Sequence, residues 1–410
     1  MKNRHKYLLA AALLAATAFS ALSAASVKIV PANEGIKEVT VASDLFEDGQ
    51  KASSITLSYA QKILSDSVSI DDYRVEGRVI TDVQVKGKDV TLILDCANKF
   101  KDDPNWNSMD DLPYETQLLV TQAGDISSSN SKIVYAGSYS VSTPPFTRPA
   151  IVEQFAEKSF IDNTTGLKFR YNIYMPEKYL SGWNYPLVIF IPDEHVNTDT
   201  AKATLLQGQG GTIWASTQEQ SKHKCLVIAV QYPLATQESY GPLTADDGSM
   251  TKGLTAIRGL IDEISRSYRI DKTRIYGVGQ AQGANALMTL AENNPDLFAG
   301  LLLVAPQKQT AAPEKLAGQK IWLQVSEGDH TAFSRANLIT DTWETAGVRV
   351  AYGKWRAEDD AKQQENAVSA MISQKAPIHC GVFVGGTRPY TWSKTYGLEG
   401  IRDWLFRQHK

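Results

Sequence analysis

Residues 275–284, Ile-Tyr-Gly-Val-Gly-Gln-Ala-Gln-Gly-Ala, carry the spacing in this sequence that bears most directly on chemistry. This spacing is typical of the G-x-S-x-G elbow, a sharp strand-to-helix turn that lifts a serine hydroxyl above a sheet. The turn glycines are present as Gly279 and Gly283, but the residue between them is Ala281. Because a methyl group cannot attack a carbonyl carbon, the segment predicts the elbow without its nucleophile.

The elements that would position this turn alternate between strands and helices from residue 151 to residue 410. Continuous apolar runs at 186–191 and 225–230 are typical of strands buried on both faces. Further strands are predicted at 274–278, 300–304, 320–325, 348–352 and 378–384, and helices at 251–268, 281–293 and 396–408. We therefore expect a mostly parallel sheet with helices on both faces.

The part of the chain before residue 151 has a different organisation. Residues 1–25 are basic, then apolar, and end in small residues, as in a secretory signal peptide cleaved after Ala25 or Ala24. Residues 26–142 contain short alternating runs, for example at 73–85 and 132–139, which predict a small antiparallel β-sandwich. Residues 143–150 are rich in proline and predict a stiff linker to the 151–410 domain. A secreted or periplasmic protein with no membrane span after signal cleavage is expected.

Charge and cysteine content narrow the classes of partner. The formal net charge of −3 becomes about −6 once the signal is removed, so no nucleic-acid partner is expected. Cys96, Cys225 and Cys380 have no metal-binding spacing, and no metal or other cofactor is predicted. Buried free thiols and a single disulfide between Cys225 and Cys380 both remain open.

Several segments together resemble a known family. They lie at 208–215, 222–225, 268–276, 321–329 and 399–406, with 46–50 and 73–78 in the N-terminal part. These segments are similar to secreted α/β-hydrolase esterases, often labelled predicted peptidases and related to feruloyl and polyhydroxybutyrate esterases, in a branch with an N-terminal immunoglobulin-like domain. The resemblance implies an immunoglobulin-like sandwich at 26–142 and an α/β-hydrolase fold at 151–410.

The resemblance also implies where a Ser, Asp and His triad would lie. The serine falls on Ala281 and the acid on Asp329, in the loop after a strand that ends at Val325. The histidine falls on Arg388, in the segment Arg-Pro-Tyr-Thr-Trp, and a slip of one residue would place it on Pro389. Because arginine stays protonated, it cannot act as the general base.

The oxyanion region departs from the family pattern as well. Relatives have a His-Gly-rich turn after the third strand, where this chain has Pro192-Asp193-Glu194-His195. Proline lacks an amide hydrogen and the carboxylates would repel an oxyanion, so only the Gln282 amide is expected to remain as a donor. The residues that could bind a ligand in the cleft are Arg388, His195 and His330.

Three hypotheses follow. The first is a pseudo-hydrolase that has lost its catalytic residues and binds an ester, glycan or peptide in the cleft. The second is a carboxylic-ester hydrolase with a relocated nucleophile, for instance Ser326 or Ser393. The third is an interaction module of the cell envelope. The sequence does not predict the oligomeric state.

Overall fold

The computed structural model describes residues 27–97, 117–130, 132–179, 182–193, 201–232, 241–307 and 312–410. These residues form two compact units. The first comprises residues up to Val41, Ser54–Asp95 and Gln117–Pro144, and the second comprises Ala42–Ser53, Cys96–Thr116 and Pro145–Lys410. The predicted signal segment lies outside the described residues. No helix in the described ranges has the length and apolarity needed to cross a membrane.

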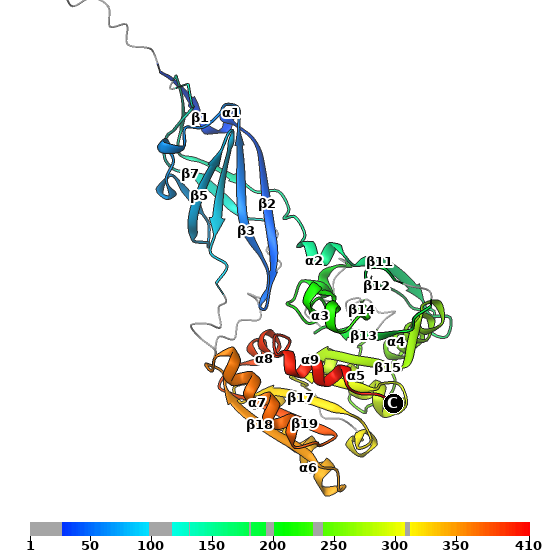
Figure 1. Cartoon of the computed structure of the whole chain (residues 1–410). Coiled ribbons are helices and arrows are strands. Elements are labelled where there is room, and N and C mark those ends of the chain that lie inside the picture. The colour runs from blue at the N-terminus through cyan, green and yellow to red at the C-terminus, as the bar shows by residue number, and fades with distance from the viewer. Residues whose placement is uncertain are drawn as a thin grey trace, which may run out of the picture. The chain divides into compact units, whose positions relative to one another are not determined.

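The first unit is built almost entirely from strands (Figure 1). Its elements are β1 (Lys28–Pro31), α1 (Ala32–Gly35), β2 (Ile36–Phe46), β3 (Gly49–Tyr59), η1 (Ser65–Ser67), η2 (Ile70–Asp72), β4 (Tyr73–Val75), β5 (Ile80–Lys86), β6 (Asp89–Leu94), β7 (Leu119–Gln122), β8 (Ile126–Ser127), β9 (Ile133–Ala136) and β10 (Tyr139–Ser142). They form sheets in the orders β2-β3-β6-β5, β1-β9-β8 and β10-β7-β4. The end of β2 and the start of β3, within Ala42–Ser53, are assigned to the second unit. The immunoglobulin-like type of this unit stays a prediction.

Two of the predicted runs in this unit are wrong as single strands. Residues 73–85 divide into β4 and β5, which lie in different sheets, because the chain turns at Gly77 with a φ of 66°. Residues 132–139 divide in the same way into β9 and β10, and Ser138 between them has a φ of 68°. Strand-forming residues lie on both sides of each turn, so residue type does not reveal the break.

The second unit alternates strands and helices. Its elements are α2 (Ala150–Glu153), β11 (Ala156–Ile161), β12 (Lys168–Tyr174), β13 (Tyr185–Ile191), η5 (Ala203–Leu205), η6 (Ile213–Ala215), α3 (Thr217–Lys222), β14 (Leu226–Gln231), α4 (Lys252–Ser267), β15 (Ile270–Gln280), α5 (Gln282–Asn293), β16 (Gly300–Val304), η7 (Pro313–Leu316), β17 (Ile321–Ser326), α6 (His330–Thr345), β18 (Val350–Arg356), α7 (Ala361–Ser373), β19 (Ile378–Val384), α8 (Arg388–Thr395) and α9 (Glu399–Phe406). The last helix begins at Glu399 instead of 396, and α8 precedes it as a separate helix.

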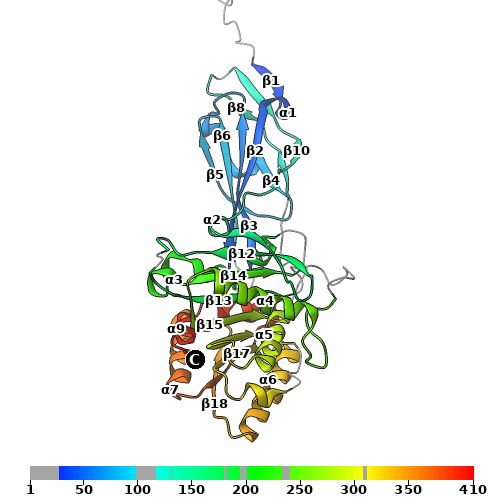
Figure 2. The ribbon, with the colours of Figure 1, turned by 90° about the vertical axis from the view of Figure 1, so that its right-hand side faces the viewer.

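The strands of the second unit form one sheet in the order β11-β12-β14-β13-β15-β16-β17-β19-β18. The pairings from β14 to β18 are all parallel, and β11 and β12 add antiparallel strands at one edge. Figure 2 shows α4, α5 and α6 on one face of this sheet and α3, α7 and α9 on the other. The two faces bury separate apolar clusters, as expected for a parallel sheet with helices on both sides.

The three cysteines are free thiols, so the disulfide left open between Cys225 and Cys380 is not formed. Cys225 and Cys380 are buried, and burial raises the pKa of the Cys380 thiol to about 12. Both thiols therefore stay protonated at neutral pH and belong to the packed interior.

Candidate functional site

The candidate site lies where the parallel strands end. β13, β15, β16, β17 and β19 end within one sheet, and the residues that follow them are Pro192, Ala281, Ala305, Glu327 and Gly385. Ligand sites in open parallel sheets form at this carboxyl edge. The strand order therefore brings the positions predicted from sequence to one edge of the sheet.

The elbow at the end of β15 has a strained backbone. Ala281 has a φ of 46° and a ψ of −112°, a conformation that costs a side-chain-bearing residue on the order of 1–3 kcal/mol. Its amide donates to the carbonyl of Val304 at 2.8 Å, and its carbonyl accepts from the Asn285 amide at 3.1 Å. Only 1% of Ala281 is exposed. The predicted turn is thus present, with a methyl group at its centre.

The two glycines of the elbow permit backbone-to-backbone packing. A Cβ on Gly283 would lie 1.9 Å from the carbonyl oxygen of Ile191, and one on Gly279 would lie 2.6 Å from the carbonyl carbon of Gly283. Real Cβ atoms do not approach other atoms this closely. The start of α5 therefore rests directly on the ends of β13 and β15.

Asp329 is buried and fully engaged. As the N-cap of α6 it accepts a hydrogen bond at Oδ1 from the Ala332 amide, at 3.1 Å. Its Oδ2 accepts from Gln307 Nε2 at 2.9 Å and from Arg388 Nε at 3.2 Å. The carboxylate that the resemblance assigns to the triad thus caps a helix and pairs with a cation, and its side chain is 4% exposed.

Arg388 is the first residue of α8 and follows the glycines after β19. Its ion pair with Asp329 joins two loops at the ends of β17 and β19. About a third of the arginine side chain, 31%, is exposed, so its guanidinium is accessible from solvent. A charged, planar group with several N–H donors at this place suits a carboxylate or another oxyanion.

The amide expected to remain as an oxyanion donor already has an acceptor. Gln282, the first residue of α5, donates its backbone N–H to Oδ1 of Asp193 at 3.3 Å. Asp193 follows β13 and is 3% exposed. A helix N-terminus favours an anion, and here the anion is a side chain of the protein itself.

His195 lies outside the described ranges, and His330, which follows Asp329 in the chain, is exposed. His330 is the exposed first residue of α6, and His409 is exposed near the C-terminal end. His379 is 1% exposed within β19, where its ring stacks on Trp322 with centroids 5.1 Å apart. Burial lowers the pKa of His379 to about 4, so it is neutral at pH 7.

The two serines considered as relocated nucleophiles have structural partners. Ser326 is 0% exposed, and its hydroxyl shares a hydrogen bond of 2.6 Å with that of Thr391. Ser393 is buried and donates to the carbonyl oxygen of Glu47 at 3.1 Å, within the second unit. Neither bond involves an imidazole, which a serine nucleophile needs as a base.

Two polar residues of this edge were missed from the sequence. Gln307 follows β16 and bonds to Asp329, and its own backbone amide donates to Oδ1 of Asn285 at 3.0 Å. Gln307 lies in a loop and Asn285 in α5, and single side-chain amides follow no spacing rule, so no sequence signal distinguishes these two. They connect the elbow helix α5 to the Asp329 loop.

No family model matches this sequence, and no curated protein sequence matches it either. Among solved structures, the chain is similar to a thermostable esterase with a TM-score of 0.62 at 20% identity, covering 92% of this chain and 100% of the esterase. The enterobactin esterase of Shigella flexneri has a TM-score of 0.43 at 10% identity, over 87% of this chain and 94% of its own. A fluorophosphonate-binding serine hydrolase of Staphylococcus aureus has a TM-score of 0.37 at 12% identity, over 62% and 98%.

These structural neighbours are esterases and serine hydrolases, and the likeness to the thermostable esterase identifies the fold. The large mixed sheet of the second unit is that of the α/β-hydrolase fold, as the sequence predicted. At 20% identity this likeness concerns the fold and not the reaction. The activity therefore depends on the residues of the site.

Proposed function

We propose that this protein is a secreted or periplasmic α/β-hydrolase-fold protein that has lost ester hydrolysis and binds a ligand or partner instead. The observation that carries the proposal is the ion pair between Asp329 and Arg388, at 3.2 Å. In a serine hydrolase the acid orients a histidine that takes the proton of the nucleophile. Here the corresponding carboxylate faces a permanently protonated group.

The elbow and the oxyanion region support the same proposal. Ala281 offers no oxygen to attack an ester, and the loss of a nucleophile costs a serine protease about 2 × 10⁶ in turnover. The carboxylate of Asp193 bonds the Gln282 amide, so an incoming oxyanion would meet a negative charge. These changes affect three different steps of the same reaction.

The ligand that fits this edge of the sheet carries an anionic group. Arg388 is a partly exposed cation at this edge, and its ion-pair partner Asp329 also accepts a hydrogen bond from Gln307 Nε2. We propose an ester, glycan or peptide that presents a carboxylate to Arg388. No cofactor is included in this proposal.

Two measurements on the purified mature protein test the proposal. Hydrolysis of p-nitrophenyl acetate and butyrate should equal the buffer background and be unchanged in Ser326→Ala and Ser393→Ala. Turnover that either substitution abolishes would overturn it in favour of a relocated nucleophile.

Binding is tested by calorimetry with short acidic peptides and with acylated or uronic-acid oligosaccharides. We expect at least one of these ligands to bind the wild type. Its affinity for Arg388→Gln should be lower by a factor of about ten or more, since one charge-assisted contact is lost. Arg335→Gln is the control, because this residue belongs to α6 rather than to the candidate site. Absence of binding, together with capture of an envelope protein by an Arg388-independent surface, would favour an interaction module instead.

A further inference from the structure

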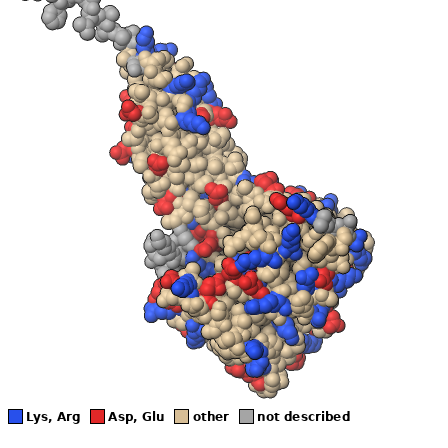
Figure 3. All heavy atoms as spheres, viewed as in Figure 1, with Lys and Arg blue, Asp and Glu red and all other residues tan. Residues whose placement is uncertain are grey.

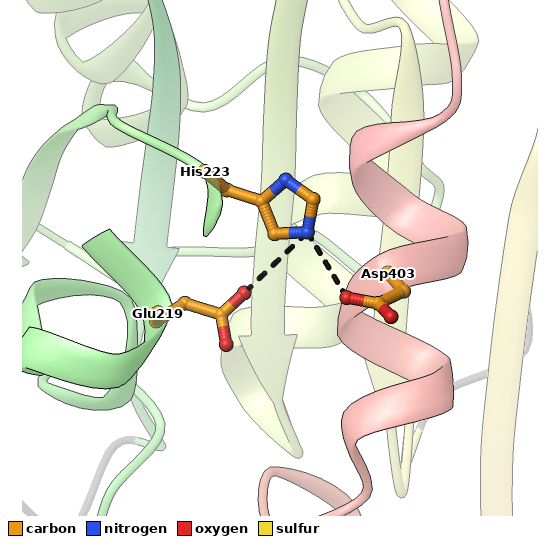
Figure 4. A group of neighbouring side chains, drawn as sticks. All are labelled: Glu219, His223 and Asp403. Carbon is orange, nitrogen blue, oxygen red and sulfur yellow. Dashed lines mark hydrogen bonds and ion pairs between the residues drawn. The ribbon is translucent and has the colours of Figure 1, made fainter. Parts of the chain in front are cut away.

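A second cluster of chemically active side chains lies away from the candidate site, between α3 and α9. It consists of Glu219, His223 and Asp403, and Figure 4 shows all three side chains directed toward one point. Glu219 and His223 are four residues apart, so they share one side of α3 and its C-cap. Asp403 approaches from α9.

The nitrogen and the two carboxylate oxygens of this cluster lie close together, but hydrogen bonds cannot connect all three. His223 Nε2 lies 3.0 Å from Asp403 Oδ1 and 4.0 Å from Glu219 Oε1, and all three atoms lie within 4.8 Å of one another. A proton on Nε2 points in one direction and can bond only one carboxylate well. At 4.0 Å, Glu219 Oε1 is beyond hydrogen-bonding distance.

The surroundings of Glu219 provide a hydrogen-bond partner for only one of its two carboxylate oxygens in the described structure. Its side chain is 1% exposed, and Oε2 accepts from Arg402 Nε at 2.8 Å. The other oxygen, Oε1, is buried and accepts no hydrogen bond in the described structure. Buried carboxylate oxygens nearly always have a partner, so this oxygen aimed at His223 indicates a cation.

From this arrangement we propose that Glu219, His223 and Asp403 bind one Zn²⁺ ion. One imidazole nitrogen and two carboxylate oxygens are ligands that zinc accepts, and at about 2.0–2.2 Å from the metal tetrahedral ligands are about 3.3–3.6 Å apart. The observed separations of 3.0 and 4.0 Å bracket this value. Because the side chains of His223 and Asp403 are 24% and 38% exposed, water can supply the fourth ligand.

The surroundings hold the imidazole in the orientation that a ligand needs. The His223 ring stacks on Phe406 of α9, with centroids 4.4 Å apart and planes 6° apart. Phe406 in turn packs edge-on against Tyr276 of β15. The ring is therefore fixed by an apolar stack, and Nε2 is left toward the carboxylates.

The role of the proposed ion follows from the position of the cluster relative to the edges of the sheet. His223 lies three residues before the start of β14 at Leu226, so the cluster is at the amino edge of the parallel strands, opposite to the elbow. A metal there would not meet a ligand at Ala281. It would join α3 to α9 and stabilise the attachment of the last helix.

The test uses the full mature protein after dialysis against EDTA, with ZnCl₂ as the probe in calorimetry and thermal unfolding. We expect one Zn²⁺ per chain and a melting temperature that rises with Zn²⁺ and falls back with EDTA. The affinity of His223→Gln and of Asp403→Asn for Zn²⁺ should be lower by a factor of about ten or more. Their melting temperatures should not change when Zn²⁺ is added.

Two control variants separate a metal site from a loss of charge or of any histidine. His409→Gln removes an exposed histidine, and Glu399→Gln breaks the neighbouring ion pair with Lys222 between the same two helices. Both should bind Zn²⁺ like the wild type. Binding by His223→Gln equal to that of the wild type would overturn the proposal. Failure of the wild type to bind Zn²⁺ would do the same, and would leave His223 hydrogen-bonded to Asp403 as the reason for their proximity.

Discussion

Introducing a serine at the elbow and a histidine beside Asp329 should not confer ester hydrolysis. We expect the double variant Ala281→Ser with Arg388→His to hydrolyse p-nitrophenyl acetate near background. It would have a serine at the elbow and a histidine near Asp329, which already lies 3.2 Å from the Arg388 side chain. However, the only amide expected to meet the oxyanion still donates to Oδ1 of Asp193, at 3.3 Å.

The size of the remaining deficit follows from this one contact. Loss of one oxyanion donor typically lowers kcat by about 10²–10³, or about 2.7–4 kcal/mol of transition-state stabilisation. The negative charge of Asp193 adds to this deficit because it faces the charge that develops on the substrate. Adding Asp193→Gly should therefore raise kcat by about 10²-fold over the double variant.

The assay compares kcat for the double variant, the triple variant and the triple variant with Asp329→Asn. The last protein serves as a control because it keeps the serine, the histidine and the freed amide but loses the carboxylate that orients the imidazole. We expect only the triple variant to rise above the others. A double variant already as fast as the triple would show that Asp193 does not block the amide, and the oxyanion argument would be wrong.

Three further outcomes follow from the described contacts. Ala281→Gly should change the free energy of unfolding by less than about 1 kcal/mol, because relief of backbone strain offsets the entropy cost of glycine and the loss of a buried methyl group. Ala286→Gly, within α5, has no strain to relieve and should lower the free energy of unfolding by about 2 kcal/mol. Urea unfolding measures both values. His379 is the second test. Its pKa is about 4 when folded and about 6.5 when unfolded, so the unfolded chain binds more protons between these values and stability should fall by up to about 3 kcal/mol from pH 7 to pH 4. His379→Phe keeps the ring stack and should remove this part of the pH dependence, and an unchanged profile would refute the assignment. Arg388→Met should cost about 1–3 kcal/mol at pH 7, and the cost should shrink in an Asp329→Asn background if the ion pair is its source.

The fold of the second unit was predictable because its signals are local. Strands buried on both faces have to be continuous apolar runs, and the runs that end at Ile191 and Val304 were found as β13 and β16. The elbow was predictable for a similar reason, since its two glycines lie between a buried strand and a helical segment. The turns near Gly77 and Ser138 were missed because strand-forming residues lie on both sides of each turn and do not indicate which sheet a strand joins.

The resemblance assigns residues to the site, but it does not give their contacts. Asp329 and Arg388 are 59 residues apart in sequence, and the structure shows that they follow β17 and β19, which are neighbouring strands. The ion pair itself depends on side-chain direction, which a sequence does not contain. The bond from Gln282 to Asp193 depends in the same way on the path of the loop after β13.

The geometry of the elbow explains why a strained turn can persist around an alanine. The positive φ of Ala281 is imposed by its neighbours, because the first turn of α5 lies against the carbonyl of Ile191 at Gly283 and against β15 at Gly279. Any relaxation of Ala281 would have to move α5 away from two strand ends. The strain is thus maintained by packing and does not depend on a nucleophile. The same packing leaves the first amide of α5 at the carboxyl edge of the sheet, where Asp193 accepts its hydrogen bond, so a change of chemistry at this site requires no change of fold.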